Sequence, residues 1–132
     1  MSENDSLTVV LVDDSPSVVA HFRGLVDCID GVEMLGTATD GVEAVVLLKS
    51  LQPDLVVMDI VMPRMDGLTA LRALRAEHPR LRVAMLSSLA GSRSRAEQAF
   101  KLGAVQVLTK PFDESKLRAL FSSEKAHKTS AG

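Results

Sequence analysis

The sequence predicts an α/β fold, a three-layer α/β/α sandwich built on a five-stranded parallel sheet. Short apolar runs alternate along the chain with longer amphipathic stretches. The apolar runs are nearly continuous, as in Leu-Thr-Val-Val-Leu-Val at residues 7–12, and this is typical of strands buried on both faces of a parallel sheet. The connections are short, so each helix is expected to cross over between parallel strands and to cover the sheet.

The apolar runs place the strands. Five strands are expected at residues 7–12, 32–39, 55–58, 81–86 and 105–108. The first, third and fourth are apolar enough for the interior of the sheet. The run at 32–39 mixes polar and apolar residues, which is typical of an edge strand. Asp59 ends the third run, and a loop follows at 60–66 because Pro63 interrupts it.

Capping and breaking residues place the helices. Ser15 is the expected N-cap of the first helix, with Pro16 at its first position, and this helix ends near Gly31. The remaining helices are expected at residues 42–51, 67–77 and 95–102, and from Asp113 or Ser115 onward. Residues 91–95 indicate a loop or a frayed helix start. Pro53 ends the second helix, and Gly103 caps the fourth.

The composition is that of a single globular domain. Of the 132 residues, 46% are hydrophobic and 24% are charged. The domain is expected to span residues 7–124, with a disordered N-terminus at 1–6 and a frayed tail at 125–132. No apolar run approaches a membrane span, the start is polar rather than a signal peptide, and the single Cys28 favours a reducing compartment. These features predict a cytoplasmic protein.

Net charge and aromatic content argue against nucleic-acid binding. The net charge is −2, and the chain has no Trp and no Tyr. A binding surface for nucleic acid needs excess positive charge, and base stacking needs aromatic side chains. We expect neither nucleic acid nor a membrane as a direct partner.

Polar residues gather where the expected strands end, and ligands of open parallel sheets bind beyond the carboxyl ends of the strands. These ends carry Asp13, Asp14, Asp59, Ser87, Ser88, Thr109 and Lys110. Three carboxylates this close together repel one another, and a hard divalent cation such as Mg²⁺ relieves the repulsion. With Lys110 also balancing a bound phosphate, one carboxylate can attack phosphorus.

Taken singly, each of these residues has a plainer interpretation. One aspartate alone is a helix cap or a solvated loop charge, and Lys110 alone is a surface lysine. Asp66, before Gly67, is interpreted as a turn or cap residue rather than a ligand. Cys28 is interpreted as a small buried hydrophobe, and His21 as partly exposed. The joint placement at four strand ends favours a functional site.

Four segments resemble the receiver domain of two-component response regulators, and of chemotaxis regulators in particular. They are Leu-Val-Asp-Asp-Ser-Pro at 11–16, Met-Asp-Ile-Val-Met-Pro-Arg-Met-Asp-Gly at 58–67, Met-Leu-Ser-Ser at 85–88 and Leu-Thr-Lys-Pro-Phe at 108–112. The Ser-Ser doublet and residues 89–94 also resemble, more weakly, the receivers of chemotaxis methylesterases. The resemblance implies the flavodoxin-like receiver fold with strand order 2-1-3-4-5.

The resemblance also implies a role for each acidic residue. Asp59 is the expected phosphoacceptor, which becomes an aspartyl phosphate. Asp14 and Asp59 are expected to bind Mg²⁺ directly, together with the backbone carbonyl of Val61. Asp13 is expected to hold a metal-bound water.

The implied function is a signalling switch. Lys110 would pair with the phosphoryl group, and Ser87 would follow it inward on activation. The donor is a histidine of a sensor kinase or phosphotransfer protein, so the domain catalyses only its own phosphorylation and dephosphorylation. Output is expected through binding of a downstream target protein or through an output domain that this sequence does not contain. The kinase is not identified, and a phosphorylation-dependent homodimer stays open.

Some positions refine this picture. Val107 stands where the family usually has Tyr or Phe, so switching runs through the loop after Ser87 or coupling is weak. Val61 and Leu89 flank the expected path of the attacking water and cannot orient it, which predicts slow self-dephosphorylation. The Lys110–Pro111 peptide is often cis in this family.

Two rival functions remain. A Mg²⁺-dependent phosphatase with an aspartyl nucleophile needs a second acid at position 61, where this chain has Val61. A degenerate receiver that only binds partners is slightly favoured by Val107, but the full set of acids, hydroxyl and lysine argues against it. A nucleotide-binding domain is excluded because no glycine-rich loop follows the first strand.

Overall fold

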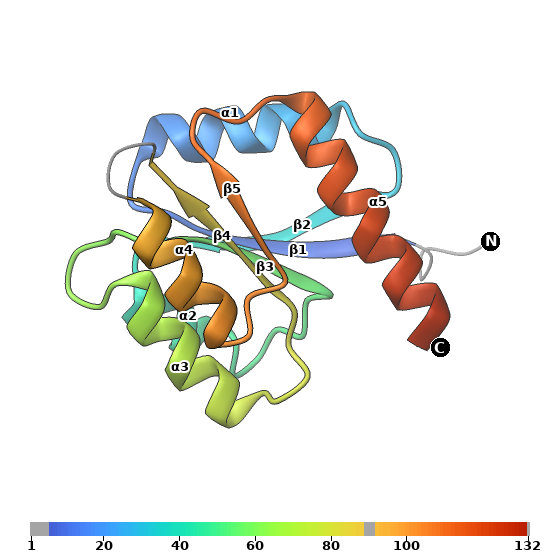
Figure 1. Ribbon diagram of the computed structural model, residues 1–132. Helices are drawn as coiled ribbons and strands as arrows, with labels where there is room; N and C mark the ends of the chain where they lie inside the picture. The colour runs from blue at the N-terminus through green and yellow to red at the C-terminus, as the bar shows by residue number, and fades with distance from the viewer. Residues whose placement is uncertain (1–5, 89–91, 132) are drawn as a thin grey trace.

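The computed structural model describes residues 6–88 and 92–131 and confirms the three-layer sandwich (Figure 1). Five parallel strands of this part of the chain form one sheet in the order β2-β1-β3-β4-β5, as the resemblance implied. The strands are β1 (Leu7–Val12), β2 (Val32–Ala38), β3 (Leu55–Asp59), β4 (Val83–Ser87) and β5 (Gln106–Thr109). The helices are α1 (Pro16–Asp27), α2 (Gly41–Leu47), α3 (Gly67–Glu77), α4 (Ser92–Lys101) and α5 (Glu114–Ala131).

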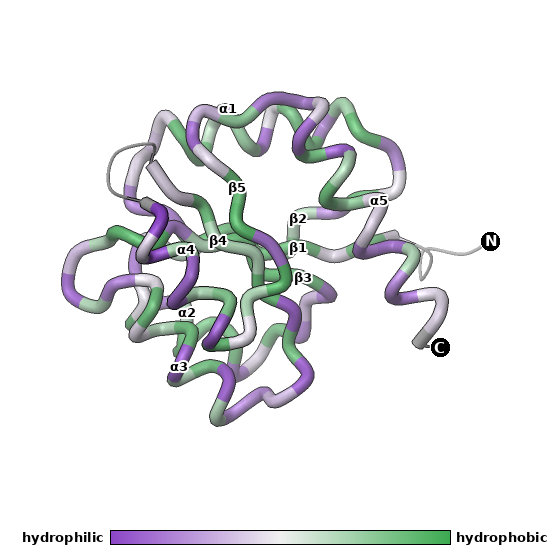
Figure 2. Tube along the Cα trace, in the orientation of Figure 1, coloured by the Kyte–Doolittle hydropathy of each residue, from purple (hydrophilic) through white to green (hydrophobic). Residues whose placement is uncertain are grey.

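Two apolar layers fill the space between the sheet and its helices. On one face, α2, α3 and α4 pack against strand residues such as Val12, Met58 and Met85. On the other face, α1 and α5 pack against the alternating residues, such as Leu11 and Val57. Figure 2 shows the hydrophobic strands inside and hydrophilic stretches along the outer helices. Because side chains of a strand point alternately to opposite faces, two apolar faces produce the continuous runs seen in the sequence.

The cap of α1 lies where the sequence predicts it, whereas the end of α2 and the start of α4 differ from the prediction. Ser15 caps α1 as predicted, because its Oγ accepts a hydrogen bond from Val18 N at 3.3 Å. The second helix ends at Leu47 rather than near residue 51, because the chain tightens into turns before Pro53. The fourth helix begins at Ser92 rather than at 95, because its first turn carries no apolar residue and so has no periodic signal.

The last helix is longer than expected, since α5 continues to Ala131 where the sequence predicts a frayed tail from residue 125. Lys128 Nζ donates to Ser6 O at 2.9 Å and to Asp54 Oδ2 at 2.8 Å. Burial raises the pKa of Asp54, but hydrogen bonds from Lys128 and Thr8 outweigh it and hold the pKa below its ordinary value of 3.8. The segment expected to be disordered, residues 1–6, lies outside the described residues except for Ser6.

The expectation that Cys28 is buried is wrong. Cys28 is exposed and forms the C-cap of α1, where its N–H donates to Leu25 O at 3.0 Å. The core face of this stretch is formed by Phe22, Val26 and Ile29, and Cys28 lies off that face. Within residues 6–88 and 92–131, no helix has the length and apolar character needed to cross a bilayer.

The backbone of Gly67 lies directly against the backbone at the end of β3, at the carboxyl edge of the sheet. A Cβ at this position would lie 2.2 Å from Asp59 O and 2.8 Å from Ile60 Cα. The Gly67 N–H donates to Ile60 O at 2.7 Å, so α3 starts directly against the end of β3. A side chain here would push backbone rather than a flexible side chain.

We predict that Gly67→Ala destabilises the fold by about 1–3 kcal/mol, since overpacking against backbone cannot be relieved by moving a flexible side chain. Gly24→Ala is the matched control, because a Cβ on Gly24 in α1 meets nothing within 4 Å. That variant should be stabilised by about 0.5–1 kcal/mol, since alanine is the better helix former. Urea unfolding measures both. Equal stabilities of the two variants would contradict the packing argument.

Candidate functional site

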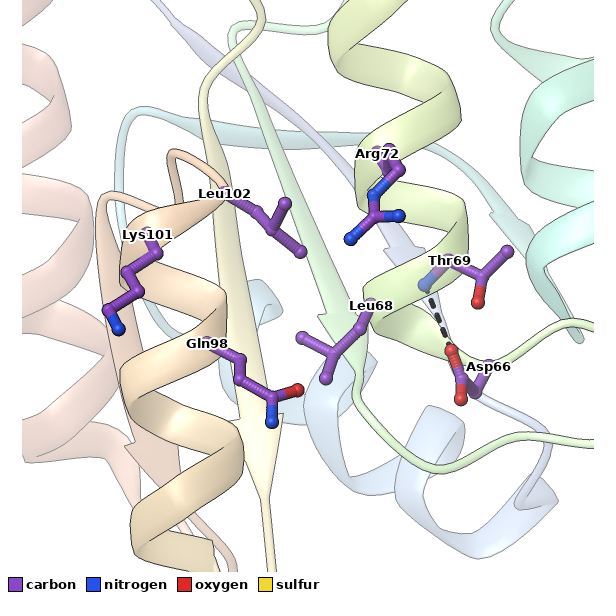
Figure 3. Close-up of a pocket in the computed structure, with 7 residues that line it drawn as sticks. All are labelled: Asp66, Leu68, Thr69, Arg72, Gln98, Lys101 and Leu102. Atoms are coloured by element: carbon purple, nitrogen blue, oxygen red, sulfur yellow. Dashed lines mark hydrogen bonds between the residues drawn. The ribbon is translucent and has the colours of Figure 1, made fainter.

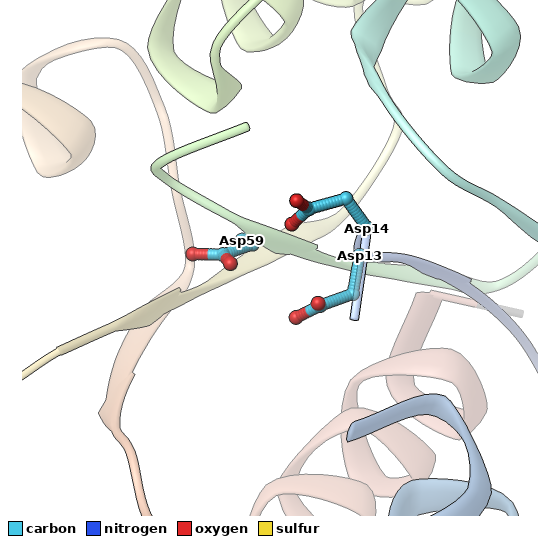
Figure 4. A group of neighbouring side chains, drawn as sticks. All are labelled: Asp13, Asp14 and Asp59. Carbon is cyan, nitrogen blue, oxygen red and sulfur yellow. The ribbon is translucent and has the colours of Figure 1, made fainter. Parts of the chain in front are cut away.

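Three carboxylates meet at the carboxyl edge of the sheet. Asp13 and Asp14 follow β1, and Asp59 is the last residue of β3. The two strands are neighbours in register, with Val12 beside Met58, so their ends are level. One oxygen of each carboxylate lies within 4.8 Å of the others, on one side of the strand ends (Figure 4). Asp13 and Asp59 are buried, with 1% and 8% exposure, whereas Asp14 is exposed.

Lys110 is the cation that faces this cluster. Its Nζ lies 2.8 Å from Asp59 Oδ2 and 3.0 Å from Asp13 Oδ2. Its backbone N–H donates to Ser87 O at 2.7 Å, which fixes the lysine beside the end of β4. Burial lowers the pKa of Lys110, but the bonds to Asp59 and Asp13 outweigh it and raise the pKa above its ordinary 10.5. The following peptide, Lys110–Pro111, is cis, as the resemblance indicated.

The environment of Asp59 disfavours the charged form of its carboxylate. Burial raises its pKa above the ordinary value of 3.8, and the nearby charge of Asp13 adds to this effect. The hydrogen bonds from Lys110 and from Val61 N, at 2.8 and 3.2 Å, act in the opposite direction without cancelling it. The carboxylate is therefore poorly solvated and gains from any further positive charge placed beside it.

The donor set fits a hard divalent cation. Three ionised carboxylates and one ammonium leave a net charge of −2 in the cluster. Asp13 Oδ2 is buried and makes no well-aligned hydrogen bond among the described residues, although Lys110 Nζ lies 3.0 Å from it. Carboxylate oxygens in small number, with room for water at exposed Asp14, are the ligands that Mg²⁺ prefers.

The hydroxyl residues lie on the neighbouring strands. Ser87 ends β4, is 5% exposed, and lies one residue beyond Leu86, which pairs with Asp59 in the sheet. Its Oγ donates to Ser88 O at 3.2 Å, so the hydroxyl is engaged with the β4–α4 loop and not with the carboxylates. Leu89, predicted to flank the water path, lies outside the described residues.

The aromatic position of the family is filled differently here. Val107 on β5 is half-buried and packs on the face covered by α2, α3 and α4. Phe112 belongs to the opposite face and contacts Phe22 edge to face. His21 is exposed and its ring stacks on Phe112 at 5.2 Å. Phe112 therefore does not take the place of an aromatic side chain at position 107.

The sequence analysis missed a contact on the loop between β3 and α3. Arg64 Nε donates to Asp40 Oδ2 at 2.6 Å, and Arg64 Nη2 also contacts that oxygen. Asp40 is buried and caps α2 by accepting from Glu43 N at 2.9 Å. The cap itself is readable from Asp40-Gly41 with Glu43 three residues on. The pairing with Arg64 has no local signal.

Asp66 and its surroundings are structural rather than part of the acidic cluster. Asp66 caps α3, accepting from Thr69 N at 2.9 Å, as predicted. It borders a hollow of about 400 Å³ between α3 and α4, in which Leu68, Arg72 and Leu102 also lie (Figure 3). None of the residues predicted for the site lines this hollow.

Comparison with known proteins agrees with this geometry. The family model of the response regulator receiver domain matches residues 9–122. A protein-glutamate methylesterase/protein-glutamine glutaminase of Geobacter metallireducens is 43% identical over 104 residues, 78% of this chain and 30% of that protein. One from Rhodospirillum rubrum is 39% identical over 106 residues, 80% of this chain and 29% of that protein. The chain thus spans about 30% of the length of these curated relatives.

Solved structures show the same likeness. The response regulator domain of Thermotoga maritima CheB has a TM-score of 0.81 and 30% identity, with 92% of this chain and 97% of that chain covered. A chain of the CheX–CheY–BeF₃–Mg²⁺ complex of Borrelia burgdorferi has a TM-score of 0.81 and 32% identity, with 89% and 88% covered. Sequence, fold and site agree, and this chain belongs to the response regulator receiver domain family.

Proposed function

We propose that this chain is a phosphorylation-controlled switch in which Asp59 accepts a phosphoryl group from a phosphohistidine. The donor is a sensor histidine kinase or a phosphotransfer protein. The observation that carries the proposal is the placement of Lys110 Nζ against both Asp59 and Asp13, at 2.8 and 3.0 Å. From this position the ammonium can move from a carboxylate oxygen to a phosphoryl oxygen, where negative charge develops during the transfer.

The transfer step balances within the site. An Asp59 oxygen forms the new O–P bond while the N–P bond of the donor breaks. The electron pair of that bond stays on the imidazole nitrogen, which then takes up a proton. Lys110 shifts its hydrogen bond toward the phosphoryl group, and the Ser87 hydroxyl turns from Ser88 O to a phosphoryl oxygen. Positioning and charge balance supply most of the rate in such transfers.

The residues that would hold Mg²⁺ are Asp14 and Asp59 directly, the backbone carbonyl of Val61, and Asp13 through a water. A bound divalent cation neutralises the charge that develops on the phosphoryl oxygens. The likeness to a receiver found in a complex with BeF₃ and Mg²⁺ supports this assignment. The net charge of −2 in the cluster supports it independently.

Output is proposed to pass through a surface that binds a downstream protein, or through an attached domain. The second route is supported by relatives of which this chain spans only about 30%. The domain is proposed to act in the cytoplasm and to catalyse no reaction other than its own phosphorylation and dephosphorylation.

We predict that Asp59→Asn abolishes phosphorylation and leaves the fold intact. Removing a charge from the crowded cluster should also raise the melting temperature without metal, since burial disfavours the charged form of Asp59. Mass spectrometry after incubation with a small phosphodonor and Mg²⁺ measures the modification. Asp66→Asn is the matched control, because asparagine still caps α3. A full phosphoryl mass gain on Asp59→Asn would place the acceptor elsewhere.

We predict that Mg²⁺ binds weakly to the wild type and that Asp14→Ala lowers its affinity by roughly ten-fold or more, because a direct ligand matters at least as much as the outer partners of a site. Amide chemical shifts during a Mg²⁺ titration report the affinity. Asp27→Ala removes an exposed acid at the far end of α1 and serves as control. Equal affinity in Asp14→Ala and wild type would rule out the proposed metal site.

We predict that Val61→Asn loses its phosphoryl group faster than wild type, by roughly three- to ten-fold, because a polar side chain beside Asp59 orients the attacking water. Val61 is 54% exposed and adjacent to the acceptor through its N–H. Val46→Asn, at a valine on α2 that is 61% exposed, is the control for added polarity. If Val61→Asn decays no faster than that control, access of water is not limited by Val61.

A further inference from the structure

Arg64 has an unusual backbone conformation. Its φ is +63°, and it is the one non-glycine residue with positive φ in residues 6–88 and 92–131. The left-handed region is unfavourable for a side chain that carries a Cβ, and a long arginine gains nothing from it locally. A conformation of this kind persists only where contacts elsewhere hold it.

The guanidinium of Arg64 is seated on a buried carboxylate. Its Nε lies 2.6 Å from Asp40 Oδ2, and Asp40 is only 3% exposed. The hydrogen bond from Glu43 N–H is the main cause that holds the pKa of Asp40 below its ordinary 3.8, and Arg64 contributes less. Burial acts in the opposite direction without cancelling them, so this carboxylate stays ionised. Leaving a buried charge without its partner is strongly destabilising. The pair is therefore held in one geometry.

Two backbone links reinforce the same junction. Gly41 N donates to Met65 O at 3.3 Å, next to the ion pair. A Cβ at Gly41 would lie 2.8 Å from Met65 O, so the first turn of α2 lies directly against the loop. At the other end of the loop, Gly67 N donates to Ile60 O at 2.7 Å. Residues 60–66 are thus held at both ends, and Val61 lies between the two attachments.

We propose that the Arg64–Asp40 pair is a positioning device for the metal site, which holds loop 60–66 in the conformation that keeps Val61 N in contact with Asp59 and from which the Val61 carbonyl would bind the cation. This inference rests on the proposed function, because it assigns a task to the loop only if a cation binds there. Among the described residues, no hydrogen bond or ion pair joins Arg64 or Asp40 to the carboxylate cluster. Their effect is transmitted along the three peptide bonds between Val61 and Arg64.

A backbone ligand depends on this support more than the carboxylates do. Asp13 and Asp59 are held by their strands and by Lys110, and the loop adds one hydrogen bond, from Val61 N to Asp59 Oδ1 at 3.2 Å. The carbonyl of exposed Val61 belongs to the loop itself, so its position follows the conformation of residues 60–66. Loosening the loop should therefore weaken cation binding and leave the Lys110–Asp59 contact unchanged.

The test compares Arg64→Gln with a matched ion-pair variant at the opposite edge of the sheet. Arg82→Gln removes a guanidinium that contacts buried Glu124 at 3.0 and 3.1 Å, just before β4. Both variants lose an arginine paired with a buried carboxylate, and only Arg64 lies on the loop. Mg²⁺ affinity is read from amide shifts in a titration, and hydrogen exchange of residues 60–66 is measured without Mg²⁺.

We expect Arg64→Gln to lower Mg²⁺ affinity by roughly three- to ten-fold, at or below the lower end of the effect of outer partners of metal ligands. Hydrogen exchange of residues 60–66 should speed up in this variant. Arg82→Gln should lower the melting temperature and change neither quantity. Arg64→Lys, which keeps a cation near Asp40, should recover part of the affinity. Asp40→Asn keeps the cap of α2 and should add little to Arg64→Gln in the double variant, because both act through one contact.

Three outcomes would overturn the proposal. One is a Mg²⁺ affinity of Arg64→Gln equal to that of wild type. Another is an equal loss of affinity in Arg82→Gln, which would make the effect one of general stability. The third is unchanged hydrogen exchange of the loop, which would show that the pair does not hold it. If the wild type itself bound no Mg²⁺, the proposed function would fail as well, and that result is distinct from the other three.

Discussion

Burial of the central strands on both faces is the constraint on which the rest of this structure depends. All residues of β3 and β4, and all of β1 except Thr8, are buried. Polar side chains that belong to these strands can therefore reach solvent or a ligand only at the strand ends. Because the strands are parallel, their carboxyl ends share one edge, and the polar residues of four different segments meet there.

The carboxylates that meet at this edge repel one another, and Lys110 offsets this repulsion only in part. Burial makes the charged form of Asp59 unfavourable, and the charge of Asp13 makes it more so. Lys110 divides a single ammonium between both carboxylates. Buried charges without sufficient partners are costly, and the remaining deficit favours a divalent cation. Under the proposed function, the same deficit would favour binding of a cation and exchange of the lysine contact for a phosphoryl group.

The loop between β3 and α3 is held by structure outside it. Gly67 permits the backbone of α3 to touch the end of β3, and the first turn of α2 lies against the other side of the loop. Arg64 has an unfavourable φ, and its guanidinium is bound to Asp40. Strain of this kind is tolerated where surrounding contacts determine the conformation, and here those contacts come from α2.

The sequence by itself determined the alternation of strands and helices, the caps at Ser15 and Asp66, and the acids at the strand ends. These features rest on patterns within a few residues, such as apolar runs and capping side chains, so they can be read without knowing the fold. The resemblance added the strand order and the expected roles of Asp59 and Lys110.

Only the tertiary structure decided the exposure of Cys28, the full length of α5 and the partner of Arg64. Each depends on groups far apart in the chain: Lys128 and Asp54 are separated by 74 positions, and Arg64 and Asp40 by 24. A polar tail or a loop arginine looks the same in the sequence whether or not such a partner exists. The difference arises when packing of the helices on the sheet brings the two charges together.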